Sequence, residues 1–160
     1  MPVRAPAPLR PDGATAHNPA VEVRDEVVDT IAGFALFADL TTPQLEQVAR
    51  TFEETWFPED TRILRQGISG SGFYLILDGT AAIRIDGVDR QVLKPGDYFG
   101  EISCLLGENP VADIVAQHQL HCLMLPADRL EPFLMSQPKV MFRLLQGEAR
   151  KLRITTRWQS

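Results

Sequence analysis

The residues best suited to chemistry lie in one stretch of the sequence, YFGEISCLLGENPVADIVA at positions 98–116. Gly100 lets the backbone approach another group closely, because glycine has no Cβ atom. The residues after it start a short helical segment, and the first N–H groups of a helix can bind an anion. The stretch therefore predicts an anion-binding turn, although Pro110 stands where a positive charge would be expected.

Catalytic and metal-binding patterns do not accompany this turn. The histidines are His17, His118 and His121, and they form no HxH or HxxxH pair that would supply metal ligands. Cys104 and Cys122 form no CxxC pair, and the sequence holds neither a GxSxG motif nor a P-loop. We expect no metal, no cofactor and no enzymatic activity.

The elements that must position the turn are predicted from hydrophobic periodicity. Helical spacing indicates helices at 23–34 and 42–52, the second capped by Thr42. From residue 53 to about 126, short β-branched and aromatic runs alternate with turn pairs such as Asp78-Gly79, which is typical of roughly eight antiparallel strands. Helical spacing returns at about 127–158, with Asp128 as a cap and Pro138 at the start of a longer helix.

The predicted fold is mainly β with flanking helices. It is an eight-stranded antiparallel jelly-roll-like barrel, or double-stranded β-helix, with N-terminal helices, a short helix inside one barrel loop and two C-terminal helices. A chain of 160 residues fits a single such domain, which we place at 22–160. The proline-rich residues 1–21 are expected to be a disordered tail.

The charge of the chain is uneven. The formal net charge is -5, but residues 138–160 carry six basic side chains against Glu148. We expect no specific DNA binding, because this basic helix alone would make salt-sensitive, sequence-independent contacts. The first residues lack the apolar centre of a signal peptide, and no apolar run is long enough to span a membrane, so we expect a cytoplasmic protein without membrane contact.

Two stretches, RQGISGSGFYLILDGTAAIRI at 65–85 and LKPGDYFGEISCLLGENPVADIVA at 93–116, together resemble the cyclic nucleotide-binding domain family. This family includes the regulatory subunit of protein kinase A and the catabolite activator protein. The resemblance covers about residues 23–158. The residues that carry it are Gly67, Phe73, Tyr74, Ile76, Gly79, Gly96, Asp97, Phe99, Gly100 and Glu101.

The resemblance implies a phosphate and ribose site, in which Glu101 accepts a hydrogen bond from the ribose 2'-hydroxyl. The candidate ligand-binding residues are Gly100, Glu101, Ile102, Ser103, Cys104, Pro110, Val111 and Ala112. Ile76 and Phe99 are candidates for the pocket lining. Leu144, Leu145 and Leu152 of the last helix are candidates for a lid over the base.

One departure from the family's pattern concerns the phosphate. The family typically continues with Pro-Arg-Thr/Ser-Ala, and this motif falls here on residues 109–112. Pro110 therefore stands at the position of the arginine, and Val111 at the position of the hydroxyl residue. Losing both donors costs about 3–5 kcal/mol, or about 100- to 5,000-fold in affinity. Arg84, Arg90 and Lys94 are the cations that could supply charge from another direction.

Two functions remain open at this stage. The first is a regulatory sensor with a degenerate phosphate site, which binds cyclic AMP, cyclic GMP or another small anion weakly, in an altered way or not at all. The second is a ligand-independent module for interaction with a protein partner or for homodimerisation. Its surface would be the last helix, with apolar positions at Val140, Leu144, Leu152 and Ile154.

Overall fold

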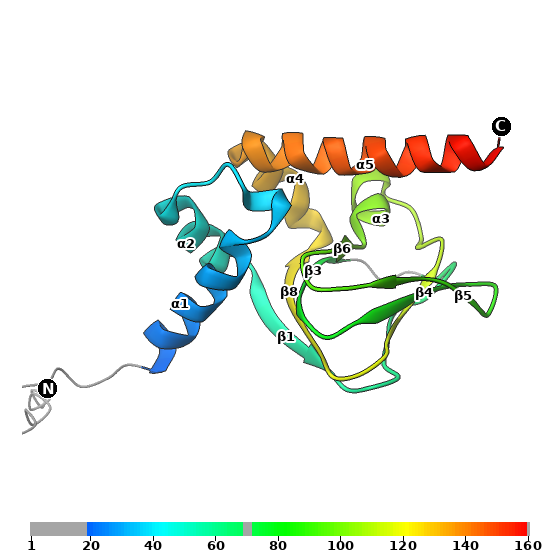
Figure 1. Ribbon diagram of the computed structural model, residues 1–160, viewed down its shortest axis with the longest axis horizontal. Helices are drawn as coiled ribbons and strands as arrows, with labels where there is room; N and C mark the ends of the chain where they lie inside the picture. The colour runs from blue at the N-terminus through cyan, green and yellow to red at the C-terminus, as the bar shows by residue number, and fades with distance from the viewer. Residues whose placement is uncertain (1–18, 69–71, 160) are drawn as a thin grey trace, which may run out of the picture.

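The computed structural model describes residues 19–68 and 72–159 (Figure 1). Its fold consists of two four-stranded antiparallel sheets, with helices before and after the strands in the sequence. Side chains are described for residues 25–68 and 72–155. The helices are α1 (Pro19–Ala32), η1 (Ala35–Phe37), α2 (Thr42–Thr51), α3 (Glu101–Leu106), α4 (Ala127–Ser136) and α5 (Pro138–Gln159). The strands are β1 (Glu53–Phe57), β2 (Arg62–Leu64), β3 (Gly72–Asp78), β4 (Ala81–Ile85), β5 (Val88–Leu93), β6 (Tyr98–Phe99), β7 (Asp113–Ala116) and β8 (Leu120–Pro126).

The strand order confirms the predicted fold class. One sheet has the order β1-β8-β3-β6 and the other β2-β7-β4-β5, so strands distant in sequence lie side by side, as in a jelly roll. β3 lies between β8 and β6 in its sheet, with Leu75 opposite Leu123 of β8. The short helix α3 follows β6 directly, which places it at the end of the sheet as expected.

The continuous apolar run of β3 has a structural reason, since both of its faces are buried. Side chains alternate between the two faces of a strand. Phe73, Leu75 and Leu77 pack against the helices, whereas Ile76 packs between the two sheets. β8 is divided in the same way, so the domain has a helical core and an inter-sheet core that share the β3–β8 pair.

The N-terminal helices differ in detail from the prediction. α1 begins at Pro19, before the expected Val23, and the predicted disorder of residues 1–21 lies largely outside the described residues. Thr41, not Thr42, caps α2: its hydroxyl accepts a hydrogen bond from Gln44 N–H, and the Gln44 side chain accepts one from Thr41 N–H. This reciprocal pair is a capping box, which satisfies two N–H groups at once.

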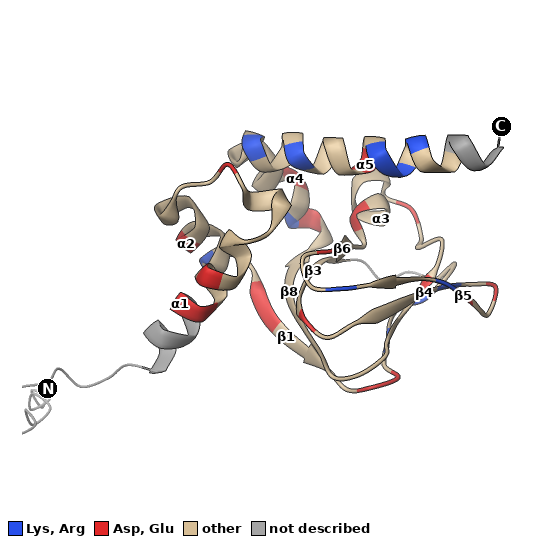
Figure 2. Ribbon diagram, in the orientation of Figure 1, with Lys and Arg blue, Asp and Glu red and all other residues tan. Residues whose placement is uncertain are grey.

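The C-terminal helices lie across the helical core. α4 follows β8 without a break. Its N-cap position is Pro126, which makes no capping hydrogen bond, and the expected cap Asp128 lies in the first turn. α5 extends past α4 and α3 (Figure 1) and buries Val140 and Leu144 in the helical core. Lysine and arginine side chains recur along α5 (Figure 2). None of the described helices is long and apolar enough to cross a membrane.

Candidate ligand-binding pocket

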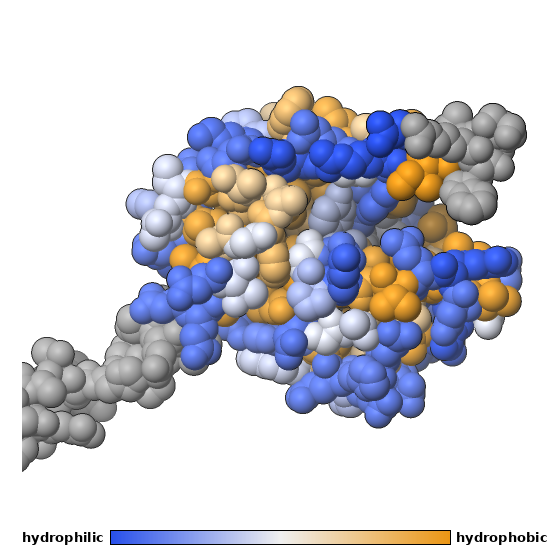
Figure 3. Space-filling model, viewed as in Figure 1, coloured by the Kyte–Doolittle hydropathy of each residue, from blue (hydrophilic) through white to orange (hydrophobic). Residues whose placement is uncertain are grey.

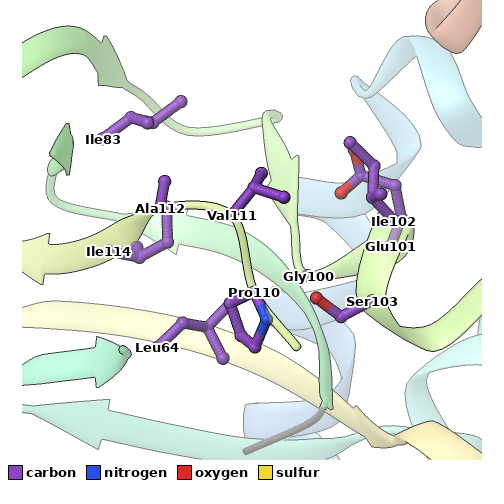
Figure 4. Close-up of a pocket in the computed structure, with 10 residues that line it drawn as sticks. All are labelled: Leu64, Ile83, Gly100, Glu101, Ile102, Ser103, Pro110, Val111, Ala112 and Ile114. Carbon is purple, nitrogen blue, oxygen red and sulfur yellow. The ribbon is translucent and has the colours of Figure 1, made fainter. Parts of the chain in front are cut away.

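A small hollow of about 120 Å³ lies between α3 and the second sheet (Figure 4). Its lining comes from β2, β4, α3, the loop that follows α3, and β7. The lining residues are Leu64, Ile83, Gly100, Glu101, Ile102, Ser103, Pro110, Val111, Ala112 and Ile114. The structure therefore brings together seven of the eight residues that were predicted to bind a ligand.

Gly100 fixes where α3 begins. Its φ of +86° lies in the left-handed region, and a Cβ atom there would lie 2.0 Å from the carbonyl oxygen of Gly72 in β3. A glycine is required here because the backbone of β3 comes so close, whether or not a ligand also binds. As a result, the first turn of α3 is held directly against the sheet.

The loop that carries Pro110 is fastened to the loop after β2. Gly67 N–H donates to the carbonyl oxygen of Pro110 over 2.8 Å, and the Asn109 side chain donates to Gly67 O over 3.2 Å. At the start of β7, Asp113 accepts a hydrogen bond of 2.7 Å from Gln66 N–H. Pro110 is buried at this junction, beside Leu64 (Figure 4). The position expected for an arginine is therefore well ordered and apolar.

Among the described residues, no lysine or arginine lines the pocket. Arg84, one of the three cations considered from sequence, donates to the Asp89 side chain over 2.7 Å, and this bond raises the pKa of the Arg84 guanidinium. Arg90 and Lys94 are exposed and lie outside the lining. Within the described chain, no group of three or more potential metal ligands is placed to hold an ion.

Among the described lining residues, Glu101 is the only acidic one, and Lys151 of α5 already neutralises it. The Glu101 side chain is only 5% exposed, and Lys151 Nζ lies 2.9 Å from Glu101 Oε1. The same ammonium lies 3.3 Å from Glu148 Oε1 and 4.6 Å from the centre of the Tyr98 ring. We call Glu101, Lys151, Glu148 and Tyr98 the α5 latch.

The electrostatics of the α5 latch follow from burial and from its two carboxylates. Burial acts to lower the pKa of Lys151, but Glu101 and then Glu148 outweigh it, so the pKa is raised and Lys151 stays charged. Burial, together with the nearby Glu101 carboxylate, raises the pKa of Glu148. Burial also raises the pKa of Tyr98 to about 12. A cation from the last helix thus occupies the carboxylate that the sequence resemblance assigned to a ribose hydroxyl, an assignment that stays a prediction.

Four predicted site residues lie elsewhere. Cys104 turns away from the pocket and packs against the helical core, because it lies on the opposite side of α3 from Ser103. Ile76 and Phe99 are buried in the inter-sheet core and do not line the pocket. Leu144 is only 3% exposed and belongs to the helical core, so it docks α5 instead of facing a ligand.

The other two lid candidates, Leu145 and Leu152, lie on the outer side of α5 and are 62% and 68% exposed. They are outside the pocket lining as well. α5 contacts the pocket through a polar residue, Lys151, which donates to Glu101. The spacing of apolar residues along the helix could not predict this polar contact.

Sequence reasoning also missed three apolar residues of the lining, Leu64, Ile83 and Ile114. They come from β2, β4 and β7 of the same sheet, in which Ile83 pairs with Ile114 and Leu64 also pairs with Ile114. Alternation along these strands could have indicated that they face inward. Which inward residues reach α3 depends on the register between strands that are far apart in sequence.

Comparison with known proteins identifies the class of protein that this fold and pocket define. Residues 54–137 match the cyclic nucleotide-binding domain family, which is more than half of the chain. The chain belongs to this family, whose domains serve regulation, and a regulatory or sensor role follows for it.

Solved structures of similar fold agree with this assignment. The CBD2 domain of PKAR with Sp-2Cl-cAMPS bound is 21% identical, with a TM-score of 0.70 over 87% of this chain and 95% of that chain. The catabolite activator protein of Thermus thermophilus is 28% identical, with a TM-score of 0.70 over 76% of this chain and 60% of that one.

A third similar structure is a mutant regulatory subunit of a cAMP-independent protein kinase A from Trypanosoma brucei. It is 23% identical, with a TM-score of 0.67 over 84% of this chain and 53% of that one. The mutant carries three substitutions, two of them at neighbouring positions, threonine to arginine and valine to alanine, and has cAMP bound in its A site. The chain thus spans only about half to three fifths of two of these three structures.

Proposed function

We propose that this protein is a regulatory domain whose pocket binds cyclic AMP and cyclic GMP weakly or not at all. Two observations carry the proposal: no lysine or arginine is among the described lining residues, and Lys151 already neutralises Glu101. A phosphate monoanion entering this hollow would lose its hydration without gaining a cation. The half-buried Asp113, at the start of β7, lies 3.7 Å from the guanidinium of Arg62, so this ion pair adds no net charge near the pocket.

The Trypanosoma brucei structures support this proposal. A regulatory subunit described as cAMP-independent has cAMP bound after a mutation that introduces arginine and alanine at adjacent positions. In the present chain, the adjacent Pro110 and Val111 carry no charge, and neither does the threonine–valine pair that was substituted in that subunit. We infer that the charge at this pair decides whether a cyclic phosphate is retained.

The second candidate function is a ligand-independent interaction module on the same fold. It is favoured by the small volume of the pocket and by the apolar Leu64, Pro110 and Val111 that line it. A small apolar pocket with few hydrogen-bond donors needs no ligand to be stable. The two candidate functions differ in whether the pocket binds a small molecule, which calorimetry can measure.

The deciding experiment is isothermal titration of the full chain with cyclic AMP, cyclic GMP, a cyclic dinucleotide and adenosine. We expect no heat of binding for the cyclic nucleotides at micromolar concentrations. Adenosine, which lacks the phosphate, tests whether charge alone prevents binding: uptake of adenosine favours an altered sensor, and absence of uptake favours the interaction module. Cyclic AMP binding at micromolar concentration would contradict the proposed function.

The α5 latch makes a separate prediction for Lys151→Ala. Removing the ammonium frees Glu101 for a ligand hydroxyl, and because the Lys151 side chain is 52% exposed, we expect the pair to be worth only about 0.2–1 kcal/mol. We therefore expect the affinity for adenosine, or the residual affinity for cyclic AMP, to rise about two- to fivefold. Titration calorimetry of Lys151→Ala beside the unmodified chain measures the change.

Arg150→Ala is the matched control for Lys151→Ala. Arg150 is the preceding basic residue of α5 and is exposed, outside the latch. The Arg150→Ala substitution should leave the affinity for the ligand unchanged. A loss of affinity in Lys151→Ala would show instead that Lys151 binds the ligand itself.

A further inference from the structure

A second hollow lies away from the pocket beside α3 and is larger than it. Its volume is about 490 Å³, against about 120 Å³ for the pocket beside α3, and α1, β1, β3 and β8 surround it. In Figure 1, α1 and β1 lie on the left, whereas α3 and β4 lie to their right. We call this second hollow the α1 hollow. Its lining residues are Glu26, Val27, Thr30, Glu54, Trp56, Leu77, Asp78 and His121.

Trp56 forms an aromatic platform in the α1 hollow, and two neighbours fix its position. In the β1–β8 pair, Trp56 lies opposite His121, and the two rings stack with centroids 4.5 Å apart and planes 6° from parallel. His121 Nε2 in turn lies 2.8 Å from Oε2 of Glu54, which shares one face of β1 with Trp56. Trp56 is still 54% exposed, so the ring face turned away from His121 can receive another group.

Carboxylates surround this platform. A bulge in β3 between Ile76 and Asp78 places Asp78 opposite His121, at the hollow. Glu26 comes from α1, and acidic positions appear in red on both α1 and β1 in Figure 2. Asp78 and Glu26 are exposed and form no ion pair with another described residue.

The charge of the α1 hollow is therefore negative. With Glu54, its described lining holds three carboxylates against one imidazole, and no lysine or arginine is among the described lining residues. The sum stays negative whether or not His121 is protonated. A cation is the complementary charge for a ligand of this hollow.

The base of the α1 hollow is apolar, although its surroundings are hydrophilic. Val27 and Leu77 are only 6% and 7% exposed, and both belong to the helical core. In the face that Figure 3 shows, hydrophilic residues predominate over the described part of α1 and beside β1, and larger hydrophobic areas lie toward β4 and β5. A ligand that fits the hollow therefore combines an apolar stem, a flat surface for Trp56 and a positive charge for the carboxylates.

We propose that the α1 hollow binds an arginine side chain from a basic segment of a partner protein. A guanidinium is planar, stacks on aromatic rings and donates in pairs to carboxylates, whereas a lysine ammonium is a compact point charge. The methylene stem of an arginine can lie against Val27 and Leu77. Free arginine is a poorer ligand, because its own α-carboxylate would be repelled by the three carboxylates. The α1 hollow is separate from the pocket beside α3, so this proposal does not depend on whether that pocket binds a nucleotide.

NMR titration of the full ¹⁵N-labelled chain tests the proposal, because the chain has only two tryptophans, Trp56 and Trp158. The probe is an acetylated and amidated hexapeptide of alternating arginine and glycine. We expect it to shift the indole N–H signal of Trp56 and not that of Trp158, with a dissociation constant below about 1 mM. The same peptide with lysine should bind at least about threefold more weakly, and the peptide with uncharged citrulline should not bind.

Substitutions in the full chain locate the binding, with affinity measured by titration calorimetry. Trp56→Ala should weaken binding of the arginine peptide about fivefold or more, because the contact of the cation with the ring is lost. Asp78→Asn should weaken it about two- to fivefold. The matched control is Glu53→Gln, which removes the same charge from an exposed residue on the opposite face of β1 from Glu54, and which should leave the affinity unchanged. Circular dichroism verifies that the variants fold.

An unchanged Trp56 signal at millimolar arginine peptide would overturn the proposal, and so would equal affinities for the arginine and lysine peptides. Equal losses in Asp78→Asn and Glu53→Gln would also overturn it, because they would show a general attraction to negative charge. The first residues of the chain itself are the competing occupant, since they include Arg4 and Arg10. We expect Arg4→Gln/Arg10→Gln to bind the peptide as the unmodified chain does. A gain of affinity in this variant would assign the hollow to those arginines and not to a partner.

Discussion

Exchange of Pro110 for arginine and Val111 for alanine is expected to create cyclic AMP binding where the unmodified chain has little or none. Both residues line the pocket, so the new guanidinium would have its stem inside the hollow and its donors near α3. Hydrogen bonds to charged groups contribute about 1.5–3 kcal/mol each, and a guanidinium can make two to a phosphate. We expect an affinity gain of at least about 100-fold, measured by titration calorimetry.

The backbone of the loop should survive this exchange. Pro110 contributes its carbonyl oxygen to the bond from Gly67 N–H, and any residue supplies that group. The exchange of valine for alanine makes room beside the new side chain.

Leu106→Arg is the control for added positive charge. Leu106 is the last residue of α3, is 62% exposed and lies outside the lining. It adds the same charge to the chain without placing it in the pocket, and it should not create binding. An equal gain in both proteins would mean that a general electrostatic attraction, and not a site, had been made.

If the double variant gains nothing, the α5 latch is the next barrier to examine. Adding Lys151→Ala to the double variant removes the competing ammonium from Glu101. A gain that appears only in this triple variant would place the barrier at the latch. No gain in either would contradict the view that this pocket is the remnant of a phosphate site.

Gly100→Ala is expected to give the largest loss of stability among glycine substitutions around α3. An alanine there would combine a φ of +86° with a Cβ atom 2.0 Å from Gly72 O, and a backbone carbonyl in a sheet cannot move aside freely. Left-handed backbone alone costs a non-glycine residue about 1–2 kcal/mol. With the displacement of β3 or α3 added, we expect a loss of about 3 kcal/mol or more in the free energy of unfolding.

Gly107→Ala separates the two contributions. Gly107 ends the same helix with a φ of +66°, but a Cβ atom there would meet nothing within 4 Å. It should cost only about 1–2 kcal/mol. Urea unfolding of both variants with equal m-values gives the comparison. Equal losses would mean that the contact with β3 relaxes without cost and that Gly100 is needed for its φ alone.

Much of the fold could be predicted because it follows from local patterns. The alternation and turn pairs of 53–126 indicate antiparallel strands, and helical spacing marks the flanking helices. The predicted caps were wrong in both helices, because Thr41 and not Thr42 caps α2 and no side chain caps the start of α4.

The candidate site was predictable where it is continuous in sequence. Gly100 to Ser103 and Pro110 to Ala112 lie within one loop and do line one pocket. Cys104 shows the limit of this reasoning, because a helix turns each successive residue by about 100° and so sends neighbours to different surroundings. The glycine at 100 was identified correctly, but the contact that requires it joins the start of α3 to Gly72 of β3, which is distant in sequence.

The sequence by itself determined the family, the order of helices and strands, and the absence of an arginine at Pro110. Only the tertiary structure decided that Leu144 is buried, that Leu64, Ile83 and Ile114 complete the pocket, and that Lys151 reaches Glu101. The physical reason is distance along the chain: periodicity reports each residue's own element, whereas an ion pair across 50 residues depends on how α5 docks over Tyr98.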